Sequence, residues 1–214
     1  MPSITLDELT EIARQIEGTP SDKFGDISKA EFGWLYTPGK PLRQLKKGTL
    51  NIDSPASQVM NFMMGGGGAL FQEAYTGTDA IAHLHNHPSG YMVPSLSDIN
   101  SFLKTLADNL RLSFELIAST VNGKVNGFYQ LEYLGKREDA RSLVAGNDER
   151  MRRACSERQR FSEKNPGLFT PGRDIFTLGE YVRFSLEAMG SSNIVGAPRP
   201  LTGHEFKDWK FYKK

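Results

Sequence analysis

The stretch Ala80-Ile81-Ala82-His83-Leu84-His85-Asn86-His87 decides how this chain can fold. Its alternation predicts a β-strand, because successive side chains of a strand point to opposite faces of the sheet. The three histidines would then share one face, and Leu84 and Asn86 would lie on the other. Pro88-Ser89-Gly90 ends the strand. The pattern therefore predicts a strand that carries three imidazoles in a row.

A helix is predicted shortly after this strand. Ser95 and Asp98 have the spacing of a capping box, in which a serine caps a helix and an acid three residues later completes the cap. Apolar residues then recur at helical spacing, namely Ile99, Phe102, Leu103, Leu106 and Leu110. Asp98 would thus lie in the first helical turn, behind the loop that follows the histidines.

His85, His87 and Asp98 together form a candidate metal site. Two imidazoles two residues apart on a strand can converge on one ion, and the carboxylate adds a third ligand. Three protein ligands with one open position are typical of catalytic zinc. Zinc lowers the pKa of a bound water to about 7, which makes hydroxide available as a nucleophile at neutral pH.

Catalysis at such a site needs a group that takes and returns a proton. Two glutamates are candidates: Glu31, at the start of the predicted strand 30–36, and Glu73, in the predicted strand 69–75. Ser95 could cap the helix and also donate a hydrogen bond to an oxyanion.

The residues His85-Asn86-His87-Pro88, followed after a gap by Ser95-Leu96-Ser97-Asp98, resemble the JAMM signature, HxHP and then SxxD, of the JAB/MPN metalloprotease superfamily. The spelling His-Asn-His-Pro-Ser-Gly resembles most the bacterial RadC-type branch. The resemblance covers roughly residues 25 to 135. It implies an α/β fold of the MPN type, with a mixed, curved sheet flanked by helices.

The resemblance implies a zinc-dependent peptidase or isopeptidase that removes a ubiquitin-like protein from conjugates or processes its precursor. His85, His87 and Asp98 would hold Zn²⁺, Glu31 would be the general base and Ser95 the oxyanion donor. In Glu31-Phe32-Gly33 the glycine comes one position earlier than in the eukaryotic pattern, so Glu73 stays a second candidate for the base. The family does not use the position of His83, for which we expect a role in orienting a ligand.

Two alternatives from other classes stay open. A RadC-like protein would associate with nucleic acid, and the arginines between residues 150 and 160 would carry the contact. An inactive scaffold would bind a modifier without cutting it. The arginines are interleaved with glutamates, which favours a solvated helix face over a nucleic-acid surface.

The amino-acid composition indicates which class of protein this chain belongs to. A hydrophobic fraction of 38%, a charged fraction of 24% and a net charge of +1 are typical of a soluble globular protein without a strongly basic face. The single cysteine, Cys155, excludes an internal disulfide framework. The acidic start of the chain and the lack of an apolar run of about 18 residues predict a cytoplasmic protein that does not engage a membrane.

We predict three segments. Residues 1–24 hold a helix, which begins with the capping box Thr5-Leu6-Asp7-Glu8, and a linker. Residues 25–135 form the JAB/MPN-like domain, which ends in a hairpin whose turn is Asn122-Gly123. Residues 136–214 form a C-terminal helical extension of unassigned role.

Overall fold

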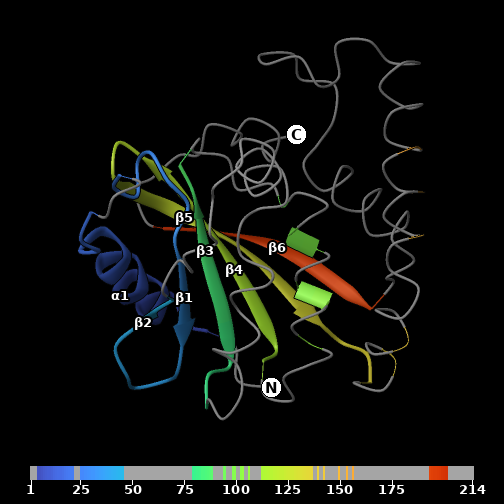
Figure 1. Ribbon diagram of the computed structural model, residues 1–214. Helices are drawn as coiled ribbons and strands as arrows, with labels where there is room; N and C mark the ends of the chain where they lie inside the picture. Colours follow the sequence, from blue (N-terminus) through green and yellow to red (C-terminus); the bar gives the residue numbers. More distant parts are fainter. Residues whose placement is uncertain are drawn as a thin grey trace.

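The computed structural model describes five stretches of the chain, together with isolated residues between them. The stretches are residues 4–21, 25–45, 79–88, 112–136 and 193–201. They contain one helix and six strands (Figure 1): α1 (Leu6–Glu17), β1 (Gly33–Tyr36), β2 (Arg43–Gln44), β3 (Ala82–His87), β4 (Phe114–Val121), β5 (Lys124–Tyr133) and β6 (Ile194–Pro200).

The six strands form one open, mixed sheet in the order β2-β1-β3-β4-β5-β6. β3 and β4 run parallel, and every other neighbouring pair in this sheet is antiparallel. A helix packed on a mixed sheet confirms the predicted α/β class. β3, the histidine strand, lies inside the sheet between β1 and β4.

The predicted N-terminal helix is confirmed as α1, and so is its capping box. The Thr5 hydroxyl accepts a hydrogen bond from the Glu8 N–H at 3.2 Å, and the Glu8 carboxylate accepts one from the Thr5 N–H at 2.7 Å. Two of the backbone donors that a helix start leaves unsatisfied are thereby paired. The buried residues of α1 form one stripe, Leu9, Ile12, Ala13 and Ile16.

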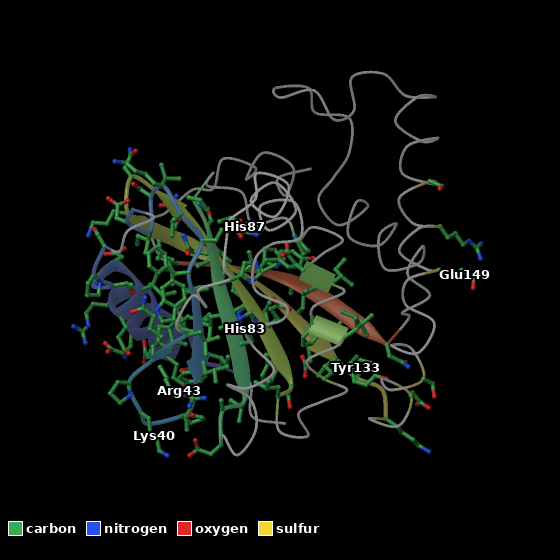
Figure 2. All side chains as sticks on the ribbon, in the orientation of Figure 1. Lys40, Arg43, His83, His87, Tyr133 and Glu149 are labelled. Atoms are coloured by element: carbon green, nitrogen blue, oxygen red, sulfur yellow. The ribbon has the colours of Figure 1, made fainter. Side chains whose placement is uncertain are left out.

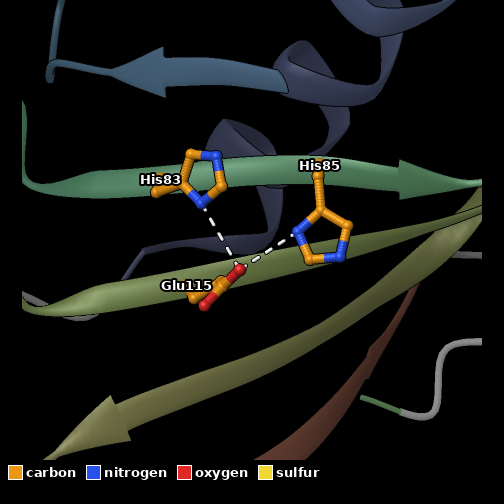
Figure 3. Close-up of side chains that lie close together, drawn as sticks. All are labelled: His83, His85 and Glu115. Carbon is orange, nitrogen blue, oxygen red and sulfur yellow. Dashed lines mark ion pairs between the residues drawn. The ribbon is translucent and has the colours of Figure 1, made fainter. Parts of the chain in front are cut away.

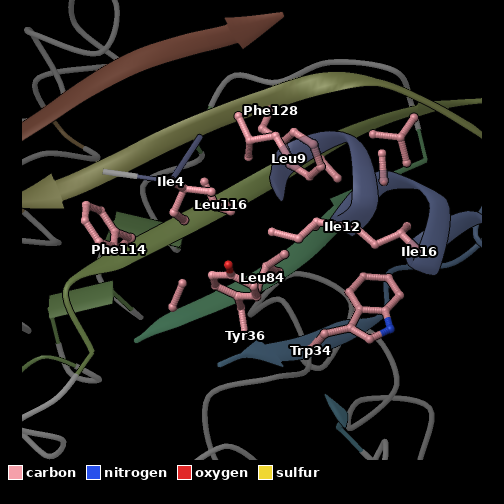
Figure 4. Packing of buried hydrophobic residues seen from close by; sticks show 14 of the residues in the cluster. Ile4, Leu9, Ile12, Ile16, Trp34, Tyr36, Leu84, Phe114, Leu116 and Phe128 are labelled. Atoms are coloured by element: carbon pink, nitrogen blue, oxygen red, sulfur yellow. The ribbon is translucent and has the colours of Figure 1, made fainter. Parts of the chain in front are cut away.

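This stripe of α1 packs against one face of the sheet and makes the main core (Figure 4). The sheet contributes side chains from four strands, including Trp34, Leu84, Leu116 and Phe128. Because Leu84 faces α1, its neighbours His83 and His85 must face the other side of the sheet. The predicted alternation of β3 is thus confirmed, and the histidines project from the face opposite α1.

The predicted hairpin is confirmed in β4 and β5. Asn122 and Gly123 have φ angles of 50° and 76°, the left-handed conformation that a two-residue type I′ turn requires at both positions. Asparagine and glycine adopt this conformation most readily.

The C-terminal segment differs from the prediction, because it is not helical throughout. Ile194–Pro200 is the edge strand β6 and pairs with β5 along its length. The sequence did not predict this strand because it contains Pro198 and Pro200. Proline lacks the N–H that a ladder of hydrogen bonds needs and is tolerated in sheets mainly at edges. Five isolated residues of the extension, Asp139, Ser142, Glu149, Arg153 and Ser156, are helical and exposed, as predicted. Among the described residues, no helix has the length and apolar character needed to cross a membrane.

Candidate metal centre

The candidate site lies at the C-terminal end of β3, on the sheet face opposite α1. His83 and His87 both project from this strand (Figure 2), and His85 lies between them. On the neighbouring strand β1, Gly33 is paired with His85. Because glycine has no side chain, β1 puts no side chain beside the imidazole of His85.

His85, His87 and Asp98 bring their ligand atoms together. The Nε2 atoms of His85 and His87 are 3.1 Å apart. The Asp98 carboxylate approaches each of them at 3.5 Å, Oδ1 towards His85 and Oδ2 towards His87. Ligand atoms at about 2.0–2.2 Å from one zinc in a tetrahedral site lie about 3.3–3.6 Å apart. The observed separations therefore suit a shared metal ion, and the three residues could hold one.

The trio is only partly enclosed. The side chains of His87 and Asp98 are 12% and 16% exposed. A site that acts on another molecule needs an accessible position on the metal, whereas a purely structural zinc site is closed by four protein ligands. This accessibility fits a reactive site better than a structural one.

Asp98 reaches the site from a helix, as predicted. Asp98 and Ile99 are helical, and so are Phe102, Leu103 and Leu106. The four apolar residues are at most 2% exposed, so this stripe fixes the helix against the protein interior. Ser95, the predicted oxyanion donor, lies outside the described residues, and so does Glu73.

Glu31 lies two residues before β1 and is exposed. In the β1–β3 ladder Gly33 is paired with His85, and a register continued by two residues would put Glu31 opposite His87. Residues paired across antiparallel strands point to the same face of the sheet. The negative charge of Glu31 also raises the pKa of His85, although less than the charges of Asp98 and Glu115 do.

Asn86 fixes the segment that carries Glu31. Its side chain is fully buried. Its Oδ1 accepts a hydrogen bond from the Phe32 N–H at 2.7 Å, and its Nδ2 donates to the carbonyl oxygens of Ile27 and Ala30 at 2.9 and 3.1 Å. The residue between the two histidines thus anchors the chain on both sides of Glu31. Sequence analysis placed Asn86 on the correct face but did not find this role.

The charges around His85 favour its protonated form in the metal-free protein. Burial lowers the pKa of His85, but the Asp98 carboxylate, a hydrogen bond to Glu115 and the charges of Glu115 and Glu31 outweigh burial. Together they raise the pKa to about 9. A cluster that stabilises a positive charge at this position is also suited to a metal cation.

Glu115 is the residue that sequence analysis missed. It lies on β4 beside His83, is 1% exposed, and contacts the Nδ1 atoms of both His83 and His85 (Figure 3). Burial raises the pKa of Glu115, but the hydrogen bonds from His83 and His85 prevail and lower it below its usual value. In the sequence Glu115 stands between Phe114 and Leu116, in a strand of the predicted hairpin, and alternation alone does not distinguish it from an acid that faces solvent.

Comparison of the chain with protein-family models, with curated proteins and with solved structures finds no match. The geometry of the site and the histidine motif are therefore the features of the chain that bear on its function. Of residues 150 to 160, which would carry the contact in the nucleic-acid alternative, the structure describes only Arg153 and Ser156.

Proposed function

We propose that this chain is a zinc-dependent hydrolase of peptide or isopeptide bonds, of the JAMM type, whose substrate is a ubiquitin-like protein joined to a lysine or extended at its C-terminus. The observation that carries the proposal is the convergence of two Nε2 atoms and one carboxylate at separations of 3.1 and 3.5 Å. The six-stranded mixed sheet with a helix on one face is consistent with an MPN-like fold.

The donor set fits zinc better than a hard cation. Imidazole nitrogens are ordinary zinc ligands, whereas magnesium and calcium take oxygen ligands almost exclusively. His85, His87 and Asp98 would hold the ion. When bound, zinc supplies Lewis acidity, which polarises a carbonyl and lowers the pKa of water.

Glu31 is the proposed general base. It is exposed, and a β1–β3 register continued past the pair Gly33–His85 would turn its side chain to the face of the histidines. In the proposed reaction Glu31 takes a proton from the attacking water and returns it to the leaving amine. Asn86 holds Glu31 in place through the three backbone groups that it binds. Ser95 is proposed as the donor to the oxyanion.

The test compares zinc content with cleavage. The purified chain is loaded with zinc and given two substrates: ubiquitin linked through its C-terminus to a lysine side chain, and a mixed peptide library read out by new amino termini. We expect cleavage that a chelator abolishes. Glu31→Gln should keep its zinc and lose about 10²–10⁴-fold in kcat, the usual contribution of a general base.

Two variants complete the design. His85→Ala should lose both zinc and cleavage, because it removes a ligand. Glu11→Gln is the matched control for the glutamate substitution, since Glu11 lies on the exposed side of α1, across the sheet from the site, and should leave both unchanged. A chain that binds zinc but cleaves neither substrate contradicts the proposed function.

A further inference from the structure

His83 and Glu115 take no part in the proposed reaction, yet they are buried and contact each other beside the metal ligand His85 (Figure 3). The Oε1 atom of Glu115 lies 3.0 Å from the Nδ1 of His85 and 3.3 Å from the Nδ1 of His83. All three side chains are buried, His85 being the most exposed of them at 9%. Two imidazoles from β3 therefore converge on one carboxylate oxygen from β4.

The chemistry of a carboxylate fixes the direction of these contacts. An ionised carboxylate only accepts hydrogen bonds, so both Nδ1 atoms must carry a hydrogen. With Nδ1 of His85 engaged in this way, its other nitrogen, Nε2, is the atom left to bind a metal. That atom is the one that faces His87 and Asp98.

The sheet builds this arrangement into the fold. β3 and β4 are parallel neighbours, with His83 paired to Glu115 and His85 to Ile117. Glu115 thus reaches both histidines from the adjacent strand, on the face opposite the α1 core. A carboxylate that is 1% exposed would be costly to bury without such partners. His83 supplies the second donor, which holds the carboxylate in position for His85.

We infer that Glu115 and His83 are a positioning pair, which orients the metal ligand His85 and holds its Nε2 towards the ion. The inference rests on the metal site of the proposed function but not on the reaction that the site performs. Outer partners of this kind are known to change metal affinity by about 10–100-fold when they are removed.

The same three side chains could instead hold a second ion, since their ligand atoms also lie within reach of one another. Two features favour the hydrogen-bonded arrangement. Both nitrogens approach a single oxygen, and the group is buried, so it presents no accessible coordination position. The number of zinc ions per chain separates the two possibilities.

The test measures zinc affinity and the protonation of His85, so it does not depend on cleavage. Glu115→Gln in the full chain should raise the zinc dissociation constant about 10–100-fold. In histidine-ring NMR spectra of zinc-loaded Glu115→Gln, the Nδ1–H signal of His85 should be shifted from its position in the unmodified protein, or absent. His83→Leu should weaken zinc binding, and His83→Gln, which keeps a donor, should restore part of the affinity.

The matched control is Glu132→Gln on β5. Glu132 is partly buried and lies on the strand next to β4. By alternation it points to the other face of the sheet, because its neighbour Leu131 is the residue paired with Glu115. It should bind zinc as the unmodified chain does. Thermal unfolding of each variant establishes that it is folded before its zinc affinity is compared.

Three results would overturn the inference. One is a folded Glu115→Gln with unchanged zinc affinity and an unchanged His85 signal. Another is a chain that holds two zinc ions and loses one of them in Glu115→Gln, which would make Glu115 a ligand. The third is a chain that binds no zinc. A chain that binds zinc normally but cleaves nothing would contradict the proposed function and leave the positioning pair intact.

Discussion

His85 is the residue at which the charges of the site meet. Its Nδ1 contacts Glu115, and its Nε2 faces His87 and Asp98. In the metal-free protein these carboxylates raise the pKa of His85 to about 9, although burial acts in the opposite direction. At neutral pH a proton therefore occupies the nitrogen that a metal ion needs, and proton and metal compete for it.

This competition predicts how zinc binding depends on pH. Binding at pH 7 must release the proton of His85, so the apparent zinc dissociation constant should fall by up to about tenfold per pH unit as the pH rises towards 9, and level off above it. Zinc titrations against a competing chelator between pH 6.5 and 10 measure this dependence.

The stability of the metal-free protein should show the opposite trend. A histidine whose pKa rises from 6.5 to about 9 on folding stabilises the fold fully below pH 6.5, and this contribution is lost as the pH rises to 9. Urea unfolding of chelator-treated protein gives the free energy at each pH. In His85→Asn the decline over this range should be smaller, and equal declines in both proteins would contradict the assignment.

The spacing of residues along the chain predicted the metal ligands, whereas the type of a residue alone did not predict its role. The intervals between His85, His87 and Asp98 predicted a trio that the structure brings together. Glu115 could not be predicted in the same way, because its partnership with His83 depends on which strands are neighbours and in which register. The local sequence of two parallel strands determines neither that they are neighbours nor the register in which they pair.

At the element scale, prediction succeeded where local chemistry alone determines structure. Alternation predicted β3, the capping box predicted α1, and Asn122-Gly123 predicted the hairpin of β4 and β5. β6 was missed because Gly196, Pro198 and Pro200 are residues that strands usually avoid. Pairing with β5, which is a tertiary contact, outweighs that local preference.

Gly196 offers a test of how β6 is held. A Cβ added at this position would lie 2.5 Å from the Cε1 atom and from the hydroxyl oxygen of Tyr129 on β5. Tyr129 is 2% exposed, so its ring has little room to move away. Gly196→Ala should therefore destabilise the protein by about 1–3 kcal/mol, the usual cost of overpacking, as measured by urea unfolding.

The neighbouring Ala197 provides the control for this prediction. Ala197 is exposed on the same strand, so Ala197→Val should change the free energy of unfolding by no more than about 0.5 kcal/mol. If both substitutions were equally mild, Tyr129 would not be packed against the backbone of β6.

In the whole molecule, all three predicted segments, residues 1–24, 25–135 and 136–214, contribute side chains to the main core. The cluster around Trp34 and Leu84 also contains Leu9 from the first segment and Leu201 from the last. Arg199 of β6 donates to the carbonyl oxygen of Ile4 at 2.6 Å. Both flanking segments thus contribute to the structure that positions the metal centre.

We therefore predict that the chain needs its N-terminal helix to fold. Leu9, Ile12 and Ile16 are at most 1% exposed, and burying each contributes about 1.5–3 kcal/mol, about 5–9 kcal/mol in all. This sum is comparable to the whole stability of a typical domain, about 5–15 kcal/mol. A chain that begins at residue 25 should be unfolded by circular dichroism and should lose its zinc.

Leu9→Ala should lower the free energy of unfolding by about 2–5 kcal/mol, whereas Leu6→Ala, at a position that is 47% exposed, should change it little. A truncated chain that folds and binds zinc would show that residues 25–214 form the core without α1.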